Sequence, residues 1–527
     1  MKAIKHILFL LMLATTLAPG CQEGFLERYP EDQLTADNFY TTPEQVGQAT
    51  IGLYNKPWFD FMDKAVWALG DLTSGNLVTF DPATVNFKLL AIGSDNTRLT
   101  ETWRSLYNVI AQSNYVINTL PDKAAGIDEA LVLRSVGEAR FMRALAYFYL
   151  VRAWGAVPII EDNEKYIFDS QVPRHTVDDI YRFIIEDLEY AAAHCPLRSA
   201  YAGADLGRVS RGAAQTLLAK VYLYRKDYSR ARAQIEEVVQ SGEYGLAGLD
   251  YDSGNAEQAY EDLFTIKGNN SRESVFQIQW AAMQLDFGNF GVQSTMQAYF
   301  APFGQGLTGT WDGWGAAEPS IDLQRAFENG DLRKKGTMMT PGAYYASLLK
   351  ADGGYTYPSD NPPGGTRASI KKYVVGRPED ENGTIGPMNT VVNTHILRYA
   401  EVLLIHAEAI LAGGTSTTDA AALASFNRVR QRAGLPAKSE LTFDDILQER
   451  RVELAFEGDY WYDLGRIDRA TAIEIISNQE RGNYGPGTPP PVYTLQVVPT
   501  SASFLMPMTA GEVAKNPRLL EDPVPFY

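Results

Sequence analysis

A run of acidic residues near the C-terminal end carries groups that could do acid–base chemistry. In QERRVELAFEGDYWYDLGR (residues 448–466), Glu449, Glu453 and Glu457 are spaced four residues apart, so they share one face if a helix extends this far. Paired carboxyl groups are what glycoside hydrolysis requires. Two arginines alternate with these glutamates, however, and Gly458 is suited to end a helix. We therefore expect an ion-paired helix packed against other helices rather than a catalytic pair.

Other catalytic and cofactor signatures are missing from the sequence. It has no HExxH, zinc-type CxxC, GxSxG, P-loop or GxGxxG pattern, and it has five histidines in all. His406 lies in IHAEA, which does not have the spacing of a zinc-binding helix. The sequence therefore predicts no enzymatic activity, no metal site and no cofactor, and it places His406 on a structural helix.

The stretch TGTWDGWGAAEP (residues 308–319) is harder to explain as structure. It places Trp311 and Trp314 three residues apart among glycines, with Asp312 between them. Glycines at this density mark a loop, and a long loop inside a compact protein usually has a function. Two large apolar rings on a loop need a reason, because no helix or strand period runs through them.

The overall composition limits the class of partner. The chain has 527 residues, 45% of them hydrophobic, which is typical of a folded protein with a large core. Its formal net charge is −17 and its pI is about 4.9. Binding to nucleic-acid phosphates needs a basic face, so the net negative charge argues against a nucleic-acid partner.

The N-terminal residues have the pattern of an export signal. Two lysines precede an 11-residue apolar run, residues 7–17, which is too short for a membrane span of roughly 20 residues. The cysteine that follows, Cys21, indicates a bacterial lipoprotein that is cleaved after residue 20 and acylated on Cys21. Plain secretion stays open, because residues 18–20 also resemble an ordinary cleavage site. Cys195 then has no partner, so we expect no disulfide.

Helical patterns dominate the rest of the chain. Thr42, Thr176 and Thr442 stand as N-caps before apolar residues at helical spacing, each with a Gln or Asp three residues later. Small residues on one helix followed by larger ones on the next are typical of tetratricopeptide-like hairpins. We expect such helices over residues 138–155, 211–240, 398–414 and 419–434. The predicted fold class is mainly α, with these hairpins forming a scaffold.

Between residues 265 and 393 the pattern changes. SVFQIQW (residues 274–280) alternates like a strand, and long segments rich in Gly, Pro, Tyr and Trp follow it. The helical scaffold is therefore expected to carry a loop-rich lobe, which contains the tryptophan loop.

Several motifs resemble those of the SusD/RagB family of surface glycan-binding lipoproteins. They are ERRVELAFEGDYWYDLGR, RYAEVLLIHAEAI and FNRVRQRAGLP in the C-terminal part, FLERYPEDQLTADNFYTTPEQVGQATIGLY near the N-terminus, and FLMPMTAGEVAKNPRLLEDPVPFY at the end. The resemblance covers both ends and most of the chain and is weak from about residue 250 to 393. It implies a signal peptide (1–20) and a single SusD-like domain (21–527) with parts 21–250, 251–393 and 394–527.

The family resemblance also implies a function. It implies a non-enzymatic glycan binder, held at the outer-membrane surface by lipid (palmitate) on Cys21, that works with a SusC-like TonB-dependent transporter. A flat aromatic ring can cover the C–H face of a sugar while polar groups bond its hydroxyls. Alternatives are peptide cargo, as in the RagB branch, a helical-repeat adaptor and a glycoside hydrolase.

The resemblance also suggests ligand contacts. Gly313-Trp314 matches a family pair in an aromatic arc, and Tyr299 in TMQAYF falls near a second arc position. Trp311, Asp312 and Asp71 are further expected contacts. A role for the tryptophans in a small local core is the alternative.

Overall fold

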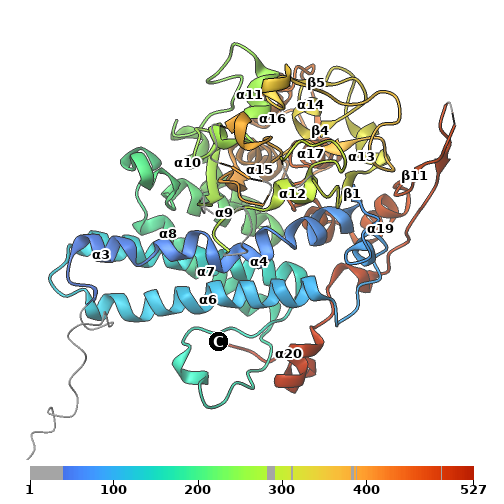
Figure 1. The fold of residues 1–527 in the computed structure, drawn as a ribbon. Coiled ribbons are helices and arrows are strands. Elements are labelled where there is room, and N and C mark those ends of the chain that lie inside the picture. The colour runs from blue at the N-terminus through green and yellow to red at the C-terminus, as the bar shows by residue number, and fades with distance from the viewer. Residues whose placement is uncertain (1–38, 282–290, 310–312, 382–384, 387, 488) are drawn as a thin grey trace, which may run out of the picture.

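The computed structural model describes residues 39–527 except 282–290, 310–312, 382–384, 387 and 488. The predicted signal peptide, Cys21, Trp311 and Asp312 lie outside the described residues. The described chain is mainly helical, as the sequence predicts (Figure 1).

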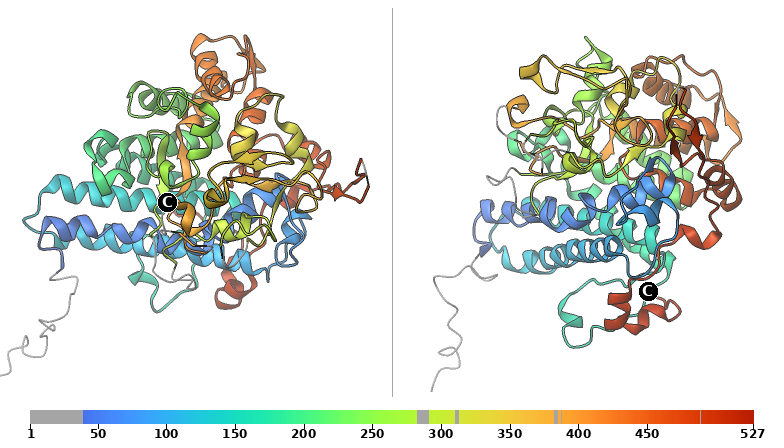
Figure 2. Two further views of the ribbon diagram at one scale, coloured as in Figure 1. Left: turned by 45° about the horizontal axis from the view of Figure 1, so that its top comes forward. Right: turned by 45° about the vertical axis from the view of Figure 1, so that its right-hand side comes forward.

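The scaffold is a row of helices in which each packs against the next. In the order of packing they are α6 (Thr97–Lys123), α7 (Glu129–Trp154), α8 (Val177–His194), α9 (Arg211–Tyr224), α10 (Tyr228–Gln240), α15 (Tyr399–Leu411) and α16 (Ala420–Arg432). Helix α15 packs on α10 although the whole loop-rich lobe separates them in sequence. Five of these helices, α7, α9, α10, α15 and α16, correspond to the hairpin helices expected from the sequence, and α6 and α8 complete the row. In the right-hand view of Figure 2 the blue and cyan helices of the scaffold lie below the yellow lobe.

Local signals explain where several helices begin. Thr42 closes a capping box at α3 (Pro43–Gln48), and Thr442 closes another at α17 (Phe443–Glu453). The Thr176 hydroxyl accepts a bond from the backbone N–H of Asp179 at the start of α8. The predicted break between α9 and α10 is made by Lys226, whose φ is +58°, and by the N-cap Asp227.

The loop-rich lobe is built from short elements. The predicted strand is β2 (Ser274–Ile278), which pairs antiparallel with β8 (Thr394–Arg398) and so joins the lobe to the start of α15. The other antiparallel pairs are β1 (Leu77–Val78) with β3 (Glu318–Pro319), β4 (Met338–Met339) with β7 (Ser369–Ile370), and β5 (Tyr344–Tyr345) with β6 (Tyr355–Thr356). Its helices are α11 (Ala256–Asp262), α12 (Met296–Phe300), α13 (Ile321–Ala326) and α14 (Arg333–Thr337).

The C-terminal elements wrap around the scaffold and the lobe. They are α17, α18 (Tyr460–Arg466), α19 (Arg469–Ser477), the projecting hairpin β11 (Asn483–Tyr484) and β12 (Val492–Tyr493), and α20 (Ala510–Lys515) (Figure 1). Smaller elements are α4 (Phe59–Met62), α5 (Val85–Lys88) and the pair β9 (Ser416–Thr417) and β10 (Leu441–Thr442). No helix in the described ranges is long and apolar enough to cross a membrane.

Candidate functional site

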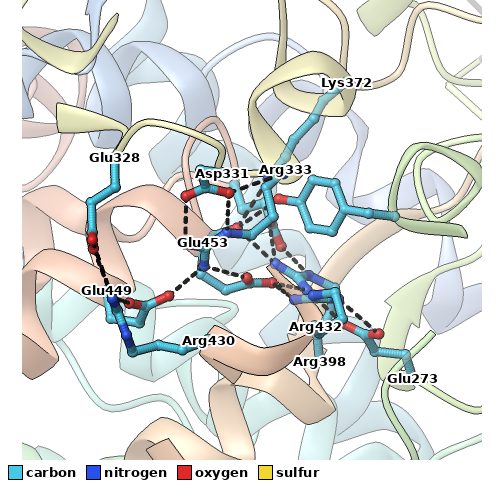
Figure 3. Close-up of polar contacts among 12 residues, drawn as sticks. Glu273, Glu328, Asp331, Arg333, Lys372, Arg398, Arg430, Arg432, Glu449 and Glu453 are labelled. Carbon is cyan, nitrogen blue, oxygen red and sulfur yellow. Dashed lines mark hydrogen bonds and ion pairs between the residues drawn. The ribbon is translucent and has the colours of Figure 1, made fainter. Parts of the chain in front are cut away.

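The acidic run first considered for catalysis is a buried ion network. The Glu453 carboxylate, which is fully buried, accepts bonds from the guanidinium groups of Arg398 (2.8 Å), Arg432 (2.6 Å) and Arg333 (3.0 Å) (Figure 3). Burial alone would raise the pKa of Glu453, but these three cations hold it well below its usual range. A carboxyl group in this state is ionised and shielded from solvent, so it cannot deliver a proton to a substrate.

Its two neighbours in the sequence are held in the same way. Glu449 is paired with Arg333 and with Arg430 at 3.2 Å. Glu457 is paired with Arg398 at 2.7 Å and with Lys372 at 2.8 Å, and these cations lower its pKa to about 2 against the opposing effect of burial. The predicted ion-paired helix is confirmed, and the network joins the lobe to the C-terminal helices.

Two details of the prediction are wrong. Helix α17 ends at Glu453 rather than at Gly458, so Glu457 lies in the turn beyond it. The arginines within the run pair with other elements rather than with these glutamates: Arg450 bonds Glu401, Asp459 and Asp463, and Arg451 bonds Asn76 and Asp322. The prediction on His406 is confirmed, because it lies on α15 with its Nδ1 2.7 Å from the Ser425 hydroxyl.

Asp71 does not lie on a ligand-binding surface. It is fully buried in a short π-helical turn (Ala68–Leu72), and its carboxylate accepts the backbone N–H groups of Phe456 (3.1 Å) and Gly458 (2.9 Å). Burial raises its pKa to about 7. The expected ligand contact is therefore corrected: Asp71 ties an N-terminal segment to the turn that follows α17.

The loop that carries Trp314 is held against the end of α12. The backbone N–H groups of Trp314, Gly315 and Ala316 donate to the carbonyls of Ala298 (2.7 Å), Ala301 (2.9 Å) and Tyr299 (2.8 Å). A Cβ at Gly313 would lie 2.3 Å from the Ala301 carbonyl oxygen, so this approach needs glycine. The Gly-Trp pair expected from the family resemblance thus has a structural reason for its glycine.

Aromatic rings around Trp314 form a series of contacts that extends from the core to the surface. The Trp314 side chain is 44% exposed, and its ring meets that of Tyr299 edge to face, with centroids 4.9 Å apart. Behind it the Tyr299 ring lies 5.6 Å from that of Trp67, which is buried in the core. Phe303, for which the sequence pattern carries no signal, is 73% exposed on the same loop, beside Gly315. We call Trp314, Tyr299 and Phe303 the aromatic platform.

Polar groups hold the platform from below. Asp63, fully buried, accepts the backbone N–H of Thr295 (2.7 Å) and the hydroxyls of Ser294 and Thr295, directly before α12. Burial raises the pKa of Asp63 to about 6, against these hydrogen bonds. Nothing in the sequence around Asp63 could have indicated this role, because its partners are more than 200 residues away.

Near the Tyr299 ring lies one further charged pair, in which Arg98 Nη1 donates to Glu101 at 2.7 Å. Burial raises the pKa of Tyr299 and the Arg98 guanidinium lowers it. The platform thus combines exposed aromatic rings with a nearby arginine–glutamate pair, a composition that suits a ligand with both apolar and hydroxyl-bearing faces.

Fold and platform together define a helical-repeat protein with an exposed aromatic cluster on its lobe. Residues 256–527 match the sequence model of the SusD family, and residues 25–223 match a second model described as starch-binding associating with outer membrane. The chain therefore belongs to the SusD family.

Relatives support this assignment along the whole chain. A SusD-like protein of Bacteroides ovatus is 34% identical over 555 aligned residues, which cover 98% of each chain. A crystal structure of a protein with xylogluco-oligosaccharide is similar at a TM-score of 0.81 and 32% identity, over 92% of this chain and 99% of the other. The starch-binding protein SusD of Bacteroides thetaiotaomicron is 23% identical over 71% of this chain and 70% of its own. SusD-like proteins thus include glycan binders.

Proposed function

We propose that this protein binds an oligosaccharide or polysaccharide at the cell surface, without turning it over, and that the aromatic platform is the principal contact. The observation that carries the proposal is Trp314, which is 44% exposed although its loop is held by three backbone hydrogen bonds and its ring lies against that of Tyr299. Holding a large apolar ring rigidly at the surface is unfavourable for the free protein, and stacking on a sugar would bury that face.

The relatives suggest which glycans to test first. A structural neighbour at 32% identity was crystallised with a xylogluco-oligosaccharide, so β-linked glucans with side-chain decorations are the first candidates. Trp311 and Asp312 stand three and two residues before Trp314 in the sequence. We include them in the site as a second stacking ring and a hydrogen-bond acceptor.

The proposal extends to the cellular setting. Lipid on Cys21 anchors the protein to the outer membrane, and a SusC-like TonB-dependent transporter receives the bound glycan. The match to a family model described as starch-binding associating with outer membrane supports this part.

Titration calorimetry on the soluble mature chain tests the proposal. We expect xylogluco-oligosaccharides, laminarin oligosaccharides or maltooligosaccharides to bind saturably, and the same samples to release no reducing ends. A panel of peptides of similar size is the comparison. Saturable binding of peptides with no glycan bound would favour the peptide-carrying branch of the family, and release of reducing ends would contradict the non-enzymatic assignment.

A further inference from the structure

A cavity that shares no residue with the aromatic platform lies between the scaffold and the C-terminal helices. Its volume is about 360 Å³, within the lower part of the range of small-molecule pockets. The end of α7, the start of α8, the end of α9 and helix α18 form its walls, and Arg469 of α19 with Phe504 and Leu505 completes them. We call it the arginine cavity.

The charges around the arginine cavity are of one sign. Four arginines line it, Arg152, Arg225, Arg466 and Arg469, and no Asp or Glu of the described chain does. This is unexpected in a protein with 64 acidic and 47 basic residues. Three of the four have carboxylate partners that lie outside the lining: Asp459 for Arg152 (3.0 Å), Asp178 for Arg225 (2.6 Å) and Glu408 for Arg466.

A lining with basic residues and no acidic ones is not common to all the cavities of this protein. Another cavity of about 390 Å³ is lined by Arg140, Arg143 and Lys165, but also by Glu161, Asp162, Glu186 and Asp187. The acidic residues of that cavity balance the charge of its basic residues, so its lining does not favour an anion.

Arg469 is the cation of the arginine cavity without a carboxylate partner among the described residues. Its Nη2 donates to the Gly465 carbonyl at 3.3 Å, and its guanidinium lies 3.8 Å from the centroid of the Phe504 ring. Phe504 in turn stacks on Trp461, with centroids 5.0 Å apart and planes at 7°. The neighbouring acid, Asp468, accepts the backbone N–H of Thr471 and so caps α19. The charge of Arg469 is therefore available to a ligand.

Hydrogen-bond donors accompany this charge. Tyr181 and Tyr462 belong to the lining, and neither hydroxyl makes a hydrogen bond to another group in the described parts of the chain. Burial raises the pKa of each to about 12, so both are protonated donors at neutral pH. Arginine and phenol donors surrounded by aromatic rings suit an acceptor-rich group attached to a flat or apolar body.

We propose that the arginine cavity binds a small organic carboxylate of about monosaccharide size, with its carboxylate beside Arg469 and its body against the rings of Tyr181, Trp461 and Tyr462. This ligand site is separate from the aromatic platform and does not depend on its function. An inorganic anion would use the charge of Arg469 but would leave the aromatic walls without a contact.

Two substitutions should impair ligand binding in the arginine cavity while preserving the folded structure. Arg469→Gln removes the charge of a partly exposed residue that has no ion pair, so folding should be preserved. Gly465→Leu adds a side chain to α18 at a lining position where a Cβ would meet no atom within 4 Å, so it narrows the cavity without a backbone clash. Arg232→Gln on α10 is the matched control, because it removes an exposed arginine paired only with Glu236.

The experiment is titration of the mature chain with glucuronate, benzoate, glucose and inorganic phosphate at low salt, with a melting curve for each variant. We expect glucuronate or benzoate to bind saturably and more tightly than glucose and phosphate. Arg469→Gln and Gly465→Leu should each weaken binding by about tenfold or more, with the melting temperature retained, and Arg232→Gln should not.

Other outcomes overturn the proposal. Equal binding of glucuronate and glucose would remove the role of the charge, and phosphate bound as tightly as either carboxylate would make this an inorganic-anion site. Absence of binding by both carboxylates, or binding that survives Arg469→Gln and Gly465→Leu, would equally exclude it. Because binding at the aromatic platform is measured with neutral glycans, failure here leaves the proposed glycan function standing.

Discussion

The rings of Trp314 and Tyr299 meet edge to face, with the two planes at 89° and the centroids 4.9 Å apart. Trp314 remains 44% exposed, while its ring is supported by a residue whose own ring contacts core Trp67. A ring supported in this way has little freedom to lose when a ligand stacks on it, so the contact is pre-organised.

Replacement of Trp314 by alanine should abolish most of the glycan affinity. Loss of a stacking aromatic at the centre of a site typically costs about 2 kcal/mol or more, a factor of about 30 in Kd. Calorimetry with the best glycan and a melting curve on the same sample check this. Phe168→Ala, which removes a fully exposed aromatic on another loop, is the control and should change neither. Unchanged affinity would remove Trp314 from the site, and a large fall in Tm would make it part of the core.

Gly313→Ala should weaken glycan binding without removing any side chain from the platform. The new methyl group would lie 2.3 Å from the Ala301 carbonyl oxygen, so the loop must move and carry Trp314 with it. We expect a clear loss of affinity. Gly511→Ala is the control, since a Cβ there meets nothing within 4 Å. Wild-type affinity in Gly313→Ala would show that the position of Trp314 is not critical.

Much of the scaffold could be predicted because its signals are local. The capping residues Thr42 and Thr442 lie three positions from the residues that complete their capping boxes, and the α9–α10 break is made by adjacent residues. The end of α17 could not be predicted in this way. The carbonyl of Glu453 accepts bonds from Tyr260, Lys372 and Arg398 side chains, all distant in sequence.

The candidate site shows the same division between local and distant signals. The loop composition singles out Trp314 as a candidate, whereas its exposure and the need for glycine at position 313 are seen only in the structure. Asp71 was misassigned because its two backbone partners, Phe456 and Gly458, lie more than 380 residues away. Because these N–H groups donate to Asp71, the turn after α17 is also tied to a segment that is distant in sequence.

The Glu453 network should contribute strongly to stability. Removing one partner from a buried ion network leaves uncompensated charge and typically costs 3–5 kcal/mol. Glu453→Gln leaves Arg333, Arg398 and Arg432 short of one negative charge. We expect the denaturation midpoint of Glu453→Gln to shift markedly to a lower denaturant concentration. Glu512→Gln, which breaks an exposed pair with Lys515, should shift it by far less. Equal effects of the two substitutions would contradict the assigned role.

Asp71 should make stability depend on pH in an unusual direction. Its pKa in the folded protein is about 7, above the ordinary value of 3.8, so the folded state binds a proton that the unfolded state has released. Its contribution is present below about pH 4 and is lost as the pH rises through 7. The free energy of unfolding of wild type relative to Asp71→Asn should therefore fall between pH 4 and pH 7. A difference that is constant or rises over this range would contradict the pKa assignment.

Cys21 should decide where the protein resides. Stable membrane attachment requires more than one acyl chain, which lipid modification of a processed N-terminal cysteine supplies. Cys21→Ala should therefore abolish recovery of the protein with the outer membrane, either by release into the soluble fraction or by blocked processing. The chain has one other cysteine, Cys195, which is buried. Cys195→Ala is accordingly the matched control and should fractionate with the outer membrane. Recovery of Cys21→Ala in the outer membrane at the wild-type level would exclude a lipid anchor at this position and favour attachment through the transporter alone.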